Sequence, residues 1–248
     1  SMEEKTVLSI IRLFALVVFA CFFPTMLTAS YDNRGVVALF LNDPAYEAKL
    51  SPIERSLAEQ GIRYRIFKIF NDELPENEKE YAGVIIAGGD SMRNYIDWND
   101  NVYQGGEIIL RGEVPILGIC LGHQIISRVF GSVLYYSDER RWHEMTLLKD
   151  DKILEGFDNG LLVWENHAYA VASIPDQFEL FARGNVTPIQ MMKHKEKEIY
   201  GVQFHPETQG GFLRNPPGWQ LIKNFAKIAG ASVVDPPLPE DGRKVFPY

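Results

Sequence analysis

The chain has 248 residues, a hydrophobic fraction of 46%, a charged fraction of 23% and a formal net charge of -8. This length suffices for one substantial domain with a well-packed core, and the composition is ordinary for a globular protein. The acidic balance gives no electrostatic reason to bind nucleic acid, and no cysteine and histidine spacing suits zinc, so we expect no nucleic-acid partner, metal or cofactor.

The N-terminal segment departs from this composition. Residues 13–23 form an unbroken apolar run that follows basic residues and precedes the small pair Ala29 and Ser30. This layout predicts a signal peptide or membrane anchor over residues 1–29, and hence a secreted, periplasmic or membrane-anchored protein whose only membrane contact is this segment. The alternative is a buried or membrane-lying N-terminal helix in a cytoplasmic protein. Cleavage near Ala29 would leave Cys120 as the only thiol, without an intramolecular disulfide partner.

The rest of the chain alternates apolar runs with amphipathic segments. Strands are predicted at residues 35–41, 64–70, 81–89, 114–120, 144–148, 161–166, 178–183, 189–194 and 199–204. Helices are predicted at residues 51–61, 121–131 and 218–230, and a further amphipathic stretch lies at 102–112.

Strands that alternate with helices favour right-handed crossovers and a sheet covered on both faces. We therefore expect an α/β fold with three layers, in which a mostly parallel central sheet is flanked by helices. The domain is expected to span residues 30–230. A proline-rich tail over residues 231–248 is expected to be extended or disordered, at best packed on the surface.

Cys120 stands between two glycines in the sequence GICLGHQ, residues 118–124, where a predicted strand ends. A glycine two residues away on each side is what a tight strand-to-helix turn requires, because the flanking backbones come close. Such a turn places the cysteine at the N-terminus of a helix, where the dipole favours the thiolate. We expect Cys120 to be a nucleophile; the alternative is a small apolar residue that fills the turn.

A thiolate nucleophile needs a proton carrier and an acceptor that orients the carrier. The sequence GVQFHPE, residues 201–207, offers His205 and Glu207 just past an apolar strand, with a proline between them. We expect His205 to act as general base and acid and Glu207 to hold its tautomer; the alternative is a solvated surface pair. Glycines of AGGD, residues 87–90, and the backbone N–H of Leu121 are expected to form an oxyanion hole.

Taken together, these three motifs make the sequence resemble the class I, or triad, glutamine amidotransferases over residues 35–230. The resemblance implies a flavodoxin-like fold. It also implies a reaction in which the cysteine attacks the side-chain amide of glutamine, forms a γ-glutamyl thioester and releases ammonia, after which water releases glutamate. It assigns further roles, with oxyanion donors at Gly89 and Leu121 and substrate contacts at Gln124, Asn166 and His167. An ordinary polar strand end is the alternative for Asn166 and His167.

Within that family, the segments VWENHAYAV and IYGVQFHPET look most like the glutaminase portion of GMP synthase. No phosphate loop or nucleotide-binding signature is present in the sequence, so a synthetase step is expected to need another chain that accepts the ammonia. A stand-alone γ-glutamyl peptide hydrolase is a second hypothesis, since the same thioester chemistry serves larger γ-glutamyl amides. A catalytically silent binding module is the third.

The other histidines are expected to have structural or surface positions. His123 should pack beside the nucleophile turn, and His143 and His194 lie in polar surroundings typical of the surface.

Overall fold

The alternation of strands and helices is present in the structure, a computed structural model that describes residues 33–46, 49–89, 103–157, 161–210 and 213–234. The described strands are β1 (Val37–Leu41), β2 (Tyr64–Lys68), β3 (Gly83–Ile86), β4 (Ile116–Ile119), β5 (Leu134–Leu147), β6 (Leu161–Val171), β7 (Phe178–Arg183), β8 (Met191–His194) and β9 (Ile199–Val202). The described helices are α2 (Pro52–Glu59), α4 (Gly106–Arg111), α5 (Leu121–Val129) and α6 (Pro216–Ala229), with 3-10 turns η1 (Pro44–Tyr46), η2 (Ile69–Asn71), η3 (Glu78–Glu80) and η4 (Lys152–Leu154).

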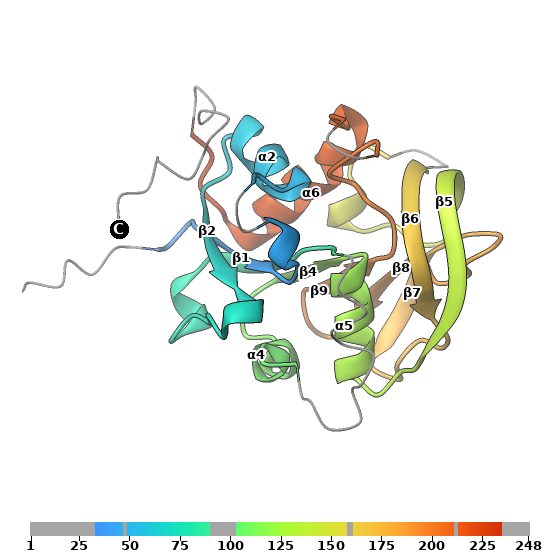
Figure 1. The fold of residues 1–248 in the computed structure, drawn as a ribbon, viewed down its shortest axis with the longest axis horizontal. Helices are drawn as coiled ribbons and strands as arrows, with labels where there is room; N and C mark the ends of the chain where they lie inside the picture. The colour runs from blue at the N-terminus through green and yellow to red at the C-terminus, as the bar shows by residue number, and fades with distance from the viewer. Residues whose placement is uncertain (1–32, 47–48, 90–102, 158–160, 211–212, 235–248) are drawn as a thin grey trace, which may run out of the picture. The chain divides into compact units, whose positions relative to one another are not determined.

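The described strands form one sheet in the order β2-β1-β3-β4-β9-β8-β7-β5-β6 (Figure 1). The pairings from β2 through β9 are parallel. The remaining pairings, from β9 through β6, are antiparallel. The predicted α/β fold is confirmed, and its sheet is mixed, with a parallel half that follows the predicted crossovers and an antiparallel half built from the later strands.

The sheet has an apolar core on each of its two faces, and helices cover both cores, which gives three layers. Alternate residues of β1 face opposite sides, so that Leu39 belongs to one core and Phe40 to the other. Helices α2 and α6 cover the first face through residues such as Leu57 and Phe225. Helices α4 and α5 cover the second face, where Ile109 is fully buried. A strand buried on both faces reads as a continuous apolar run, as predicted for β1.

The start of α2 follows the predicted capping signals. The Ser51 hydroxyl accepts the N–H of Glu54 at 3.3 Å, and the Glu54 carboxylate accepts the N–H of Ser51 at 2.9 Å. Pro52 occupies the first helical position. This double cap determines the residue at which α2 begins.

The ribbon of β5 and β6 is longer than predicted. The two strands pair along most of their length, with an irregularity between Tyr136 and Glu139. The part of β5 before the predicted strand lacks an apolar alternation, because it buries the polar residues Glu139 and His143. A hydrophobic pattern therefore could not predict this part, which contributes Arg140 to the wall of the candidate site.

The beginning of the predicted tail is tied to the domain. The N–H of Ser232 donates to the carbonyl of Gly35 at 2.7 Å, and Val233 forms an isolated bridge with Ile62. Within the described ranges, none of the helices has the length and apolar character that a membrane crossing requires. The predicted signal peptide lies outside the described residues, as does the remainder of the tail.

Candidate active site

The turn around Cys120 has the geometry that the glycine spacing predicts. Strand β4 ends and helix α5 begins on either side of this residue, whose φ of 49° and ψ of -102° are strained for a side chain other than glycine. A Cβ atom on Gly118 would lie 2.5 Å from the carbonyl oxygen of Gly122. A Cβ atom on Gly122 would lie 2.1 Å from the carbonyl oxygen of Ile86. Both glycines are therefore required by close backbone contact.

Parallel pairing brings the three sequence motifs to one edge of the sheet. The last residue of β3 lies beside Gly118 of β4, and the last residue of β4 lies beside the last residue of β9. Residues 87–89, Cys120 and residues 203–207 consequently leave the sheet together at its carboxyl edge, where parallel sheets gather their ligands.

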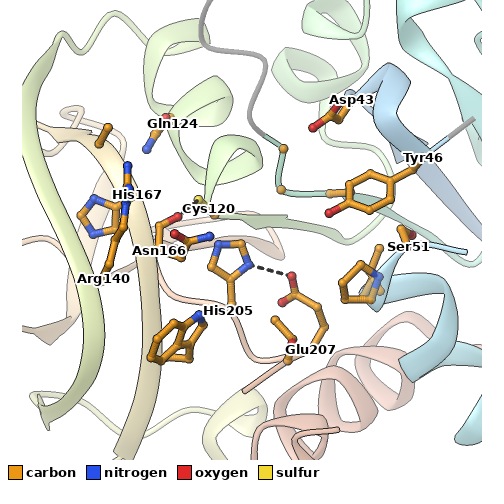
Figure 2. Close-up of a pocket in the computed structure, with 18 of the residues that line it drawn as sticks. Asp43, Tyr46, Ser51, Cys120, Gln124, Arg140, Asn166, His167, His205 and Glu207 are labelled. Carbon is orange, nitrogen blue, oxygen red and sulfur yellow. Dashed lines mark hydrogen bonds and ion pairs between the residues drawn. The ribbon is translucent and has the colours of Figure 1, made fainter. Parts of the chain in front are cut away.

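Cys120, His205 and Glu207 meet at this edge (Figure 2). The Nδ1 atom of His205 lies 2.8 Å from Oε1 of Glu207, and Figure 2 shows the ring between that carboxylate and the thiol. The Nε2 atom has no hydrogen-bond partner among the described residues, which leaves it available to the thiol. Two backbone contacts hold the pair: the N–H of His205 donates to the carbonyl of Trp164 at 2.9 Å, and Nε1 of Trp219 donates to the carbonyl of Glu207 at 3.0 Å.

The electrostatics of this group favour a charged imidazole ring. Burial alone would lower the pKa of His205, but the charges of Glu207 and Cys120, together with the hydrogen bond between the ring and Glu207, raise the pKa well above its ordinary value. Solvent screens these charges weakly, since the side chains of His205 and Glu207 are only 12% and 6% exposed. Cys120 is a buried free thiol. An imidazolium beside a thiolate can perform acyl transfer.

A pocket of about 630 Å³ opens at the nucleophile. Its walls come from the segment after β1, the start of α2, helix α5 and the β5–β6 ribbon, and they include Asp43, Ser51, Gln124, Arg140, Trp164 and Asn166. No group of three or more histidine, cysteine, aspartate or glutamate side chains in the described part of the chain is arranged to hold a metal ion.

The glycines after β3 lie against the nucleophile turn. A Cβ atom on Gly88 would lie 3.1 Å from Cε1 of His205 and 3.5 Å from Cβ of Cys120. A Cβ atom on Gly89 would lie 3.4 Å from Cδ2 of Leu121. The two predicted oxyanion residues, Gly89 and Leu121, thus lie close together at the nucleophile turn, and the first N–H groups of α5 lack intrahelical acceptors. The final residue of the AGGD motif lies outside the described residues.

The predicted substrate contacts Gln124 and Asn166 both line the pocket. The backbone oxygen of Asn166 lies 3.9 Å from Sγ of Cys120, and Nε2 of Gln124 donates to the carbonyl of Tyr169 at 2.6 Å. Sequence reasoning missed Gln203, whose Nε2 lies 3.8 Å from the same Sγ and whose Oε1 accepts from Gln124 at 3.3 Å. The sequence feature that could have indicated Gln203 is its position as a polar residue at the end of the apolar strand predicted at residues 199–204.

His167, the third predicted substrate contact, is among the residues that line the pocket, but its ring is buried and engaged by the protein itself. Its Nδ1 lies 3.0 Å from the carbonyl oxygen of Ser137, and its Nε2 lies 3.1 Å from Oε2 of the fully buried Glu165. Because a carbonyl only accepts, we assign a proton to Nδ1. The ring therefore ties β6 to β5 and shapes the pocket wall.

The other histidines divide between confirmed and wrong predictions. His123 packs beside the turn as predicted, and burial together with the nearby charge of His167 lowers its pKa to about 3. The surface positions predicted for His143 and His194 are wrong, since both are buried. Nε2 of His143 accepts the N–H of Asn185 at 3.2 Å, and Nδ1 of His194 accepts from the backbone two and three residues further along. The polar residues on either side of each histidine suggested a surface position, and the sequence gives no sign of these contacts with the backbone.

Comparison with known proteins agrees with this geometry. The family model "Glutamine amidotransferase class-I" matches residues 45–227. A glutamine-hydrolyzing GMP synthase subunit from Methanopyrus kandleri is 39% identical over 184 residues, which cover 72% of this chain and 91% of the relative. The same subunit from Pyrococcus furiosus is 37% identical over 183 residues, which cover 72% of this chain and 92% of the relative.

Solved structures share the fold. A putative GMP synthase subunit from Thermoplasma acidophilum matches with a TM-score of 0.63 and 24% identity, over 79% of this chain and 94% of that chain. A glutamine amidotransferase from Thermotoga maritima matches with a TM-score of 0.57 and 24% identity, over 69% of this chain and 76% of that chain.

None of these comparisons supports the signal peptide or the membrane association predicted for residues 1–29. The family model, by contrast, extends over most of the chain and includes all three motifs of the site. On these grounds the chain belongs to the class-I glutamine amidotransferase family.

Proposed function

We propose that this chain hydrolyses the side-chain amide of L-glutamine to glutamate and ammonia through a γ-glutamyl thioester on Cys120. The observation that carries this proposal is the buried pair of His205 and Glu207, 2.8 Å apart, beside a cysteine on a strained strand-to-helix turn. The similarity to glutamine-hydrolysing subunits supports the choice of glutamine as substrate.

In the first half of the reaction, the thiolate of Cys120 attacks the carbonyl carbon of the side-chain amide. The C=O electron pair moves onto oxygen, and the backbone N–H groups of Gly89 and Leu121 stabilise the resulting oxyanion. The C–N bond then breaks while the imidazolium of His205 gives its Nε2 proton to the leaving nitrogen, which departs as ammonia. Glu207 keeps Nδ1 protonated and the ring in place.

In the second half, neutral His205 takes a proton from a water molecule as the water oxygen attacks the thioester carbonyl. The C–S bond breaks and the electron pair returns to the sulfur of Cys120. The new carboxyl group of the product gives up its remaining proton, which the released ammonia takes up as ammonium, so the product leaves as glutamate. The imidazolium and thiolate of the resting state are restored, so no external acid, base or oxidant is consumed.

We also propose that the ammonia passes to a synthetase chain, because the relatives are named as one subunit of GMP synthase. The amidotransferase domain is proposed to span residues 30–230. The cytoplasmic alternative suits this role better than export, since ammonia released outside the cell would diffuse away unless an acceptor enzyme were docked there. Sequencing the N-terminus of the protein from its native host tests this point: an unprocessed start supports it, and a mature start near Ser30 contradicts it.

Release of glutamate from L-glutamine, and from a panel of γ-glutamyl peptides, by the full chain tests the reaction. We expect activity on glutamine that is weak alone, rises with a partner and is lost in Cys120→Ala. The matched control is Cys21→Ala, which removes the other cysteine and should keep the activity. Turnover confined to γ-glutamyl peptides would instead favour the stand-alone hydrolase. Absence of any covalent labelling at Cys120 by a glutamine-like electrophile would favour the silent binding module.

A further inference from the structure

Three contacts to backbone oxygens of β6 show which parts of the pocket lie beside which residues of this strand. They are, in chain order, the N–H of His205 to the carbonyl of Trp164 at 2.9 Å, Sγ of Cys120 to the backbone oxygen of Asn166 at 3.9 Å, and Nε2 of Gln124 to the carbonyl of Tyr169 at 2.6 Å. If His205 protonates the leaving nitrogen, as proposed above, the leaving group lies toward Trp164. The rest of the γ-glutamyl chain then extends toward Tyr169.

Arg140 stands beside the middle of this series. It lies on β5 directly opposite Asn166 in the antiparallel register and lines the pocket. Directly opposite residues of an antiparallel pair have their side chains on the same face, so the side chain of Arg140 leaves the ribbon on the same face as that of Asn166. Among the described residues that line the pocket, it is the only lysine or arginine.

The guanidinium group of Arg140 has donors to spare. Its Nε lies 3.2 Å from Oδ1 of Asp138, and this is its one ion pair with the described residues. The side chain is 64% exposed, and Arg140 is among the residues that line the pocket. The neighbouring Arg141 differs, since its Nη2 lies 3.0 Å from the carboxylate of Glu139, which is buried on the other face of the ribbon.

The charges at the two flanks of the pocket are opposite. Asp43 lines the flank that follows β1, where a Cβ atom on Gly89 would lie 3.0 Å from Cβ of Asp43. Figure 2 shows Asp43 on the side of the pocket away from Arg140. A substrate carboxylate on the Asp43 flank would meet a like charge, whereas on the Arg140 flank it would meet an opposite one. A free glutamyl group carries both an α-ammonium and an α-carboxylate, and this polarity sets its orientation.

We propose that Arg140 binds the α-carboxylate of the γ-glutamyl substrate and thereby restricts the site to compounds whose glutamyl group has this carboxylate free. The planar guanidinium group suits a carboxylate because it offers parallel N–H donors in a fixed fork. The proposal rests on the proposed function, and it adds a specificity-determining residue that sequence motifs do not indicate.

Alkylation of Cys120 provides a test that needs neither turnover nor a partner. The full chain is treated with 6-diazo-5-oxo-L-norleucine, a glutamine analogue that alkylates thiols, and with the same compound whose α-carboxylate is converted to the amide. Iodoacetamide, which has no glutamyl group, reports the intrinsic reactivity of the thiol. Rates at Cys120 are measured by mass spectrometry for the wild type and for Arg140→Gln. Arg183→Gln is the matched control, because it removes the same charge from an exposed position outside the pocket lining.

In the wild type we expect the amide analogue to react about tenfold more slowly than the carboxylate, the scale of one charge-assisted contact. In Arg140→Gln this difference should shrink to about twofold or less, while the iodoacetamide rate stays unchanged. Arg183→Gln should behave as the wild type. The proposal is overturned if the wild type does not distinguish the two analogues, or if Arg140→Gln distinguishes them equally well. If iodoacetamide labels Cys120 and neither analogue does, the proposed function fails as well.

Discussion

The pair of His205 and Glu207 provides the sharpest test of the proposed site. Substitution of Glu207 by glutamine keeps the shape of the side chain but removes its negative charge. In the wild type, Oε1 of Glu207 lies 2.8 Å from Nδ1 of His205, and the two side chains are 6% and 12% exposed. The contact is thus buried, and the described residues offer no hydrogen-bond partner to Oε2 of Glu207 that could compensate.

Two effects should follow from Glu207→Gln. Burial lowers the pKa of His205 while Glu207 and Cys120 raise it, so loss of the Glu207 charge must move this pKa downward. The imidazolium would then lose its proton at a lower pH than in the wild type, and the share of the thiolate–imidazolium pair at neutral pH would fall. We expect kcat for glutamine hydrolysis to drop by about 10²- to 10⁴-fold, the scale seen when a buried carboxylate that orients a catalytic histidine is neutralised.

The pKa of His205 is measured by NMR titration of its ring protons, and kcat is measured by glutamate release. The matched control is Glu179→Gln, which breaks an exposed ion pair with Lys149 at 2.8 Å and should change kcat by less than about twofold. The reasoning is refuted if Glu207→Gln leaves the pKa of His205 unchanged and keeps kcat within about threefold of the wild type.

Three further predictions address packing and pH. Gly88→Ala should lower kcat by about tenfold or more with little change in thermal stability, because its Cβ atom would lie 3.1 Å from Cε1 of His205; unchanged kcat would contradict this. Gly122→Ala should lower the free energy of unfolding, measured in urea, by about 3 kcal/mol or more, because its Cβ atom would lie 2.1 Å from the carbonyl oxygen of Ile86. A variant as stable as the wild type would contradict the close backbone contact at this turn. Folding lowers the pKa of His123 to about 3 from 6.5, so between these two pH values the unfolded protein binds more protons at this residue than the folded protein does. The free energy of unfolding should therefore fall as the pH decreases over this range, by at most about 1.4 kcal/mol per pH unit. Urea unfolding at several pH values should show that His123→Gln loses this part of the pH dependence, and an identical dependence in both proteins would refute it.

Much of the fold could be predicted because the parallel half of the sheet is buried on both faces. Such strands have continuous apolar runs, and the turn that follows β4 is marked by Gly118 and Gly122, which close packing requires. The nucleophile turn could be found for the same reason, since its constraint lies within a few consecutive residues. The meeting of Cys120 with His205 and Glu207 was predictable because parallel strands end at a common edge.

The β5–β6 wall could not be predicted, because its residues are selected by contacts distant in sequence. Arg140 has no signal of its own in a charged segment, and only the register with Asn166 places it at the pocket. Likewise, Glu165 and His167 are buried as a polar pair that the hydrophobic pattern cannot represent. The proposed carboxylate-binding role of Arg140 thus depends on a tertiary contact and not on a local motif.

The most direct test of the central claim is to trap the acyl-enzyme. The full chain is mixed with L-glutamine, quenched with acid within the first turnovers, and the peptide that contains Cys120 is examined by mass spectrometry. We expect a γ-glutamyl group on Cys120 that disappears as glutamate is released, and no such group in Cys120→Ala. Release of glutamate without a γ-glutamyl adduct at Cys120, or with undiminished rate in Cys120→Ala, would contradict it.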